Sequence, residues 1–216
     1  EYSLGTVRYW RGPMEVIGLP LPGTELKLVP QGANYEVRVR SAAQMPPAGY
    51  LGDTRASAVC FDEEGYFCTG DAVRFHDSSR PHLGLVFAGR LAEAFKLQTG
   101  TWVSAGVLRN DLLTTAGGLF DEAVICGLNM PHVAALIWVN SVAVRDLLDG
   151  TEYATEEVLA HPLVRSAVHS RIAKFNTDNT SSSRFIRAAR IMTTPLSAAA
   201  GELTDKGSAN QQRVRE

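Results

Sequence analysis

Asp71, Arg90 and Lys206 are three charged residues of this 216-residue chain whose side chains could take part in chemistry. Asp71 and Arg90 each follow a glycine, and Lys206 is flanked by Gly201 and Gly207. A carboxylate accepts two hydrogen bonds at once, a guanidinium offers a fixed fork of donors, and an ammonium offsets negative charge on a reacting group. The glycines around Lys206 predict a mobile loop. The structural alternatives are a turn aspartate, a surface arginine and a solvated lysine.

Several common kinds of site are absent from the sequence. Cys60, Cys68 and Cys126 form no CxxC pair, and their odd number argues against a disulfide framework, so we expect buried thiols. The five histidines include no HExxH pair. The sequence also lacks a GxGxxG turn after a strand, a GxxxxGK[ST] phosphate loop and a GxSxG elbow. Zinc, self-contained phosphate-binding and serine-hydrolase motifs are therefore excluded.

Length and composition indicate one or two ordinary globular domains. The net charge is −2, with 45% apolar and 20% charged residues, which excludes a disordered chain and a dominant nucleic-acid binder. No run of apolar residues is long enough to predict a membrane span. Position 1 is Glu1 rather than Met, without a leader pattern after it, so we expect the chain to be the end of a longer protein.

Apolar runs between turn residues predict a mixed α+β fold. Up to about residue 90, alternating segments favour a small antiparallel sheet or barrel, with a turn over 30–33. Beyond that point strands and helices do not alternate as they do in βαβ units. A stripe from Leu163 to Phe175 at helical spacing predicts packing surface. The predicted strands are 25–29, 35–40, 85–88, 121–126, 133–139 and 184–192, the last with a basic face, and the predicted helices are 142–148 and a segment from Thr155 that Pro162 kinks or restarts.

Four segments occur in a characteristic order and spacing. They are 35–50 (YEVRVR and PPAGY), 62–71 (DEEGYFCTGD), 89–100 (GR, then Lys96 and a glycine) and 201–207 (GELTDKG). Together they resemble the motifs of the adenylate-forming acyl-CoA synthetases. The amino-acid sequence of these segments, together with the preceding stretch 17–30 (IGLPLPGTELKLVP), is most similar to that of feruloyl-CoA synthase-like enzymes. The resemblance spans nearly the whole chain, but the family's N-terminal part, with its phosphate loop and most of the acyl pocket, is missing.

The resemblance implies a role for each matching residue. Asp71 would accept hydrogen bonds from the ribose hydroxyls of ATP, and Arg90 would contact the ribose and phosphate region. Lys206 would be the catalytic lysine, between the substrate carboxylate and the α-phosphate. Ala92 would lie at the pivot between two domains, where the family often has Asp or Lys, and Glu1 would bind Mg²⁺.

The resemblance further implies two domains and a two-step ligase. Residues 1–91 would form the β-rich C-terminal part of the large AMP-binding domain, and residues 92–216 would form the small mobile lid domain. ATP, Mg²⁺ and coenzyme A would serve a cytoplasmic enzyme that converts an acid to an acyl-adenylate and then to a thioester. A hydroxycinnamate such as ferulate would be the substrate.

Two alternatives stay open. The thiol acceptor could belong to a carrier protein rather than to coenzyme A. The chain could also be a non-catalytic fragment that only binds nucleotide, and alone it is expected to be inactive. Ala92 and Leu51 depart from the commonest residues of the superfamily at their positions, but neither replaces a reacting group.

Overall fold

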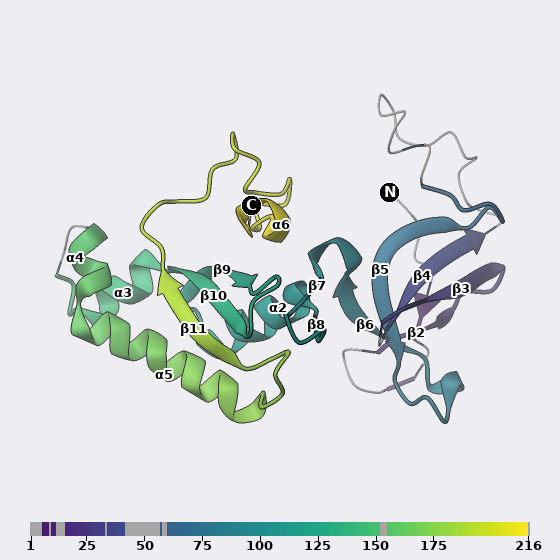
Figure 1. Cartoon of the computed structure of the whole chain (residues 1–216), viewed down its shortest axis with the longest axis horizontal. Helices are drawn as coiled ribbons and strands as arrows, with labels where there is room; N and C mark the ends of the chain where they lie inside the picture. The colour runs from purple at the N-terminus through teal and green to yellow at the C-terminus, as the bar shows by residue number, and fades with distance from the viewer. Residues whose placement is uncertain are drawn as a thin grey trace. The chain divides into compact units, whose positions relative to one another are not determined.

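A computed structural model describes residues 6–8, 10–11, 16–32, 34–41, 57, 60–151 and 155–215. The chain divides into two compact units, unit 1 (Glu1–Ala92) and unit 2 (Glu93–Glu216), and Figure 1 labels most of their helices and strands. Within the described ranges, no helix is both long and apolar enough to cross a bilayer. Asp71 and Arg90 belong to unit 1, and Lys206 belongs to unit 2.

Unit 1 is built on an antiparallel sheet. Its described residues form six strands in the order β1-β2-β6-β5-β4-β3, so the sheet is open rather than a barrel. Alternating side chains of these strands form the core, in which Val37, Val39 and Val73 are at most 8% exposed. The predicted strands at 25–29, 35–40 and 85–88 are confirmed. The elements are β1 (Thr6–Val7), β2 (Val16–Pro20), β3 (Thr24–Gln31), β4 (Asn34–Ser41), β5 (Phe67–Phe75) and β6 (Leu85–Arg90), with the 3-10 turn η1 (Pro81–Leu83). A second 3-10 turn, η2 (Leu91–Glu93), spans the boundary between the two units.

The hairpin between β3 and β4 is tighter than the sequence predicts. Pro30 and Gln31, expected in the turn, extend β3 and pair with Tyr35 and Asn34. β3 is the edge strand of the described sheet, and a proline, which lacks an N–H donor, is tolerated at such an edge. The prediction of a turn over 30–33 is therefore wrong for residues 30 and 31, which belong to β3.

Unit 2 combines a small sheet with helices (Figure 1). Its described residues include the sheet β11-β10-β9, in which β10 is antiparallel to β9 and parallel to β11. Helices and sheet share one core, in which Leu112 and Ile137 are fully buried. The α+β fold class is confirmed. The elements are β7 (Phe95–Lys96), β8 (Trp102–Val103), α2 (Ala105–Ala116), β9 (Phe120–Cys126), β10 (Val133–Val139), α3 (Ser141–Leu147), α4 (Thr155–Ala160), α5 (Pro162–Asp178), β11 (Ile186–Ile191) and α6 (Gln211–Arg215).

Most predicted elements of unit 2 are confirmed, with two differences. Strands occur at 120–126, 133–139 and 186–191, and Pro162 begins a new helix, as a residue without an N–H can. Helix α2 was not predicted, although Leu108, Leu112 and Ala116 recur every four residues on its buried face. The prediction that Leu163 packs inward is wrong. It is 54% exposed in the first turn of α5, whereas its neighbour Val164 is buried.

Leu112→Ala should destabilise unit 2 strongly, because Leu112 is fully buried between α2 and the sheet. The cavity left when a buried leucine is shortened to alanine typically lowers the free energy of unfolding by about 2–5 kcal/mol. Urea unfolding followed by circular dichroism would measure the change. The matched control is Leu128→Ala, because Leu128 is 57% exposed and should cost little. Equal losses in both variants would contradict the assigned core.

Candidate functional site

Asp71 and Arg90 face each other on neighbouring strands of unit 1. β5 and β6 run antiparallel and pair these two residues in register. Asp71 Oδ1 lies 2.9 Å from Arg90 Nε, and Arg90 Nη1 donates a hydrogen bond of 3.2 Å to Thr69 O. The structure therefore brings together the carboxylate and the guanidinium that the sequence analysis singled out.

The backbone before Asp71 is irregular. The register between β4 and β5 skips Thr69 and Gly70, so these two residues bulge out of the ladder. Gly70 has φ +69°, a conformation that glycine adopts without strain. Thr69 Oγ1 donates to Val37 O at 2.5 Å and accepts from the Asp71 N–H at 3.0 Å, which fastens the bulge. Thr69 belongs to the 62–71 motif segment, but the sequence alone assigns it no role; its place two residues before Asp71 is the available signal.

The Asp71 carboxyl lies at the boundary between the protein interior and solvent. Its side chain is 30% exposed, but Oδ1 is buried and accepts no hydrogen bond from the described residues. The contact with Arg90 is thus an ion pair without the alignment of a hydrogen bond. Burial raises the pKa of Asp71 above its ordinary value, and the Arg90 charge offsets part of that rise. This carboxylate retains acceptor capacity that a ligand could use.

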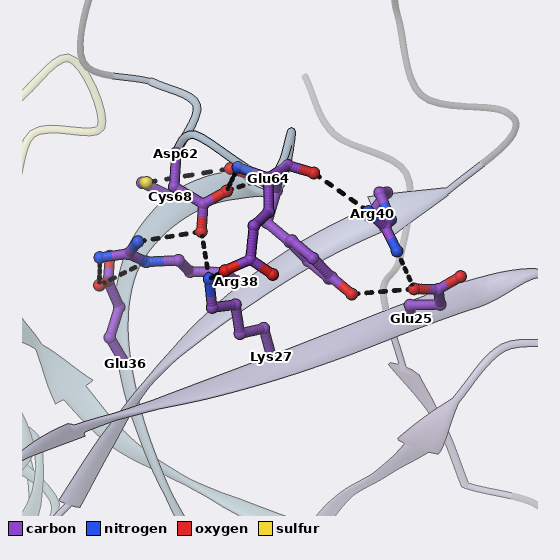
Figure 2. A network of polar contacts seen from close by, with 9 residues as sticks. Glu25, Lys27, Glu36, Arg38, Arg40, Asp62, Glu64 and Cys68 are labelled. Atoms are coloured by element: carbon purple, nitrogen blue, oxygen red, sulfur yellow. Dashed lines mark hydrogen bonds and ion pairs between the residues drawn. The ribbon is translucent and has the colours of Figure 1, made fainter.

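The hairpin that leads into β5 is held by a polar network, shown in Figure 2. Asp62 Oδ1 accepts the backbone N–H groups of Glu64 (3.0 Å) and Tyr66 (2.9 Å), and Oδ2 accepts from Lys27 (3.0 Å) and Arg38 (3.1 Å). Partial desolvation raises the pKa of Asp62, but these four donors outweigh it and hold the pKa well below its usual range. The Asp62 carboxylate is therefore committed to structure, and it anchors the segment that precedes Asp71.

Lys206 lies in unit 2, in a tight turn just before α6. Leu203 and Ala209 form an antiparallel bridge across the base of this turn, and the Thr204 N–H donates to Ser208 O at 2.8 Å. The Lys206 side chain is exposed. The glycine-flanked segment that carries it is thus a hydrogen-bonded turn from which Lys206 is exposed to solvent.

The remaining predicted residues are placed only in part. Ala92 is exposed, belongs to η2 and is the last residue of unit 1. Glu1, Leu51 and the motif segment 46–50 lie outside the described residues. Across the ranges that are described, no group of three or more His, Cys, Asp or Glu side chains is arranged to hold a metal ion. These residues therefore do not form a complete metal site.

Comparisons with known proteins identify the fold. No family model matches the chain, and no curated protein matches it. The A domain of carboxylic acid reductase from Segniliparus rugosus, solved with AMP and a co-purified carboxylic acid, is 22% identical with a TM-score of 0.67, over 94% of this chain and 32% of that one. The amide bond synthetase McbA from Marinactinospora thermotolerans is 23% identical with a TM-score of 0.53, over 93% and 35%.

A third solved structure is the anthranilate CoA ligase AuaEII with anthranoyl-AMP. It is 18% identical with a TM-score of 0.57, over 92% of this chain and 34% of that one. The chain thus spans about a third of the length of the solved proteins that it resembles. The chain therefore shares its α+β fold with part of these solved proteins, among them an adenylation (A) domain.

Proposed function

We propose that this chain is the C-terminal part of an enzyme that uses ATP to activate a carboxylic acid and then transfers the acyl group to coenzyme A. The acid's carboxylate would attack the α-phosphate of ATP, which gives an acyl-adenylate and pyrophosphate. The thiol of coenzyme A would then attack the acyl carbonyl, and AMP would leave. The shared fold with a domain solved with AMP and a ligase solved with anthranoyl-AMP supports this proposal.

The Asp71–Arg90 pair is the observation that carries the proposal. Ribose hydroxyls are hydrogen-bond donors, and the partly exposed Asp71 carboxylate has acceptor capacity to receive them. Arg90 is 58% exposed beside it and keeps a permanent positive charge that suits the neighbouring phosphate. The chemistry of these two groups therefore fits a nucleotide.

Lys206 is the proposed catalytic residue of the first step. Its exposed ammonium would lie between the attacking carboxylate and the α-phosphate, where negative charge accumulates in the transition state. Holding both reactants would also reduce the entropy lost in bringing them together. We propose that unit 2 moves between the two half-reactions, with its pivot at Ala92.

Mg²⁺ is the expected metal of this reaction, and it would neutralise charge on the phosphates of ATP. Glu1 is the proposed ligand, but it lies outside the described residues. Among the described residues, no group of three or more His, Cys, Asp or Glu side chains could hold a metal ion. The roles proposed for Asp71, Arg90 and Lys206 do not depend on the metal.

The proposal also names the acid substrate and the thiol that accepts the acyl group. The segments that resemble feruloyl-CoA synthase-like enzymes favour a hydroxycinnamate such as ferulate, and a cytoplasmic ligase that acts in phenylpropanoid breakdown. A carrier-protein thiol is the second candidate acceptor. It is favoured by the likeness to a carboxylic acid reductase solved as an A-PCP didomain, 21% identical over 94% of this chain.

The test is acid-dependent exchange of pyrophosphate into ATP, measured with the complete enzyme that contains this chain. We expect ferulate to support exchange, and coniferyl alcohol, which lacks the carboxylate, to support none. Adding coenzyme A should then produce the thioester and AMP. If exchange occurs but only a carrier protein accepts the acyl group, the second candidate is correct. Absence of exchange with every aromatic acid tested would overturn the proposal.

A further inference from the structure

The turn that carries Lys206 is fastened to the sheet of unit 2 by two buried polar side chains. Gln211 is 1% exposed and Glu122 is 8% exposed, so both are removed from water although neither is apolar. They lie far apart in the sequence, Glu122 on β9 and Gln211 at the start of α6. A buried polar group is costly unless its hydrogen bonds are made, so such residues usually have a specific task.

Gln211 occupies the open edge of β9. Its Oε1 accepts from the Ile125 N–H at 2.9 Å, and its Nε2 donates to Ala123 O at 2.9 Å. β9 is the edge strand of the described sheet, and both of these backbone groups face away from β10. The side-chain amide thus takes the place of a peptide group from a neighbouring strand. This contact determines where the chain that follows Lys206 meets the sheet.

Glu122 holds the other end of the same segment. Its Oε2 accepts from the Ala209 N–H at 2.8 Å, and Ala209 closes the base of the Lys206 turn through its bridge with Leu203. Both carboxylate oxygens of Glu122 also accept from the Arg109 guanidinium, which lies on α2. The turn is thereby tied to the helix layer as well as to the sheet.

We propose that Gln211 and Glu122 are positioning residues for Lys206, an inference that rests on the proposed catalytic role of this lysine. Neither residue touches a reacting group. Together they fasten the residues that follow Lys206, at positions 209 and 211, so the direction of its side chain follows from the sheet rather than from the turn alone. A small misplacement of a reacting group is enough to slow catalysis substantially.

The experiment compares Gln211→Met with Gln212→Met in the complete enzyme. Methionine has nearly the volume of glutamine but makes neither hydrogen bond, and Gln212 is exposed on the same helix. We expect kcat for adenylation to fall on the order of 10- to 100-fold in Gln211→Met, with an unchanged KM for ATP and an unchanged rate of thioester formation from synthetic acyl-adenylate. Amide hydrogen exchange across 203–209 should also accelerate, while Gln212→Met should resemble the parent in every measurement.

A second variant separates positioning from folding. In Gln211→Glu, a protonated carboxyl can donate to Ala123 O and accept from the Ile125 N–H, whereas a carboxylate can only accept. The ratio of variant to parent kcat for adenylation should therefore rise as the pH falls, with circular dichroism confirming that the variant is folded. A ratio that does not change with pH would overturn the inference.

The outcomes distinguish this inference from the proposed function. If Lys206→Ala stops adenylation but Gln211→Met changes only hydrogen exchange, the positioning role is wrong and the proposed function stands. If Lys206→Ala leaves adenylation intact, the catalytic role of the lysine is wrong, and the positioning role is overturned with it.

Discussion

Replacing Lys206 with alanine should lower the rate of acyl-adenylate formation by about 100- to 1,000-fold, a loss comparable to that of other groups that stabilise transition-state charge. Lys206 is exposed in its turn, so its removal should not disturb the core of unit 2. Thioester formation from synthetic acyl-adenylate should proceed at the parent rate, because the role proposed for the lysine is confined to the attack on the α-phosphate. Single-turnover assays of the two half-reactions would measure both rates.

The matched control for this variant is Lys174→Ala. Lys174 is an exposed lysine on α5, outside the Lys206 turn. Its replacement should leave both half-reactions unchanged. Equal losses in the two half-reactions of Lys206→Ala would show that the lysine does not act in adenylation alone, and the assignment would then be refuted.

The change Asp71→Ala should raise the KM for ATP by about 10- to 100-fold, because hydrogen bonds to a charged group contribute more than neutral ones. The variant removes the acceptor proposed for the ribose and leaves Arg90 without its ion-pair partner, 2.9 Å away. The maximal rate at saturating ATP should fall much less, since the role proposed for Asp71 is at the ribose and not at the α-phosphate. Steady-state kinetics with varied ATP would separate the two effects.

Asp77→Ala is the matched control in unit 1. Asp77 accepts hydrogen bonds from Ser79 and Arg80 in the loop that follows β5, and it has no proposed role in binding. The KM for ATP of the Asp77→Ala variant should equal that of the parent enzyme. An unchanged KM for ATP in a folded Asp71→Ala variant would count directly against nucleotide binding at this pair.

The local patterns of the sequence predicted much of the secondary structure, because alternation and helical spacing reflect which side of an element is buried. The strand around 25–29 follows from alternation, and those around 121–126 and 133–139 follow from short apolar runs bounded by turn residues. Helix α2 was missed although its apolar residues recur every four positions. Motif resemblance, rather than periodicity, singled out Asp71, Arg90 and Lys206.

Only the tertiary structure decided how these residues are held. The bulge at Thr69 and Gly70 depends on how β5 pairs with β4, and the contact of Asp71 with Arg90 depends on how β5 pairs with β6. Gln211 is a polar residue that no local sequence pattern marks as buried. Its burial against β9 follows from a contact between segments far apart in the chain. Local patterns record the burial of an element's faces, but the hydrogen-bond partners of buried polar groups are determined by the packing of the whole unit.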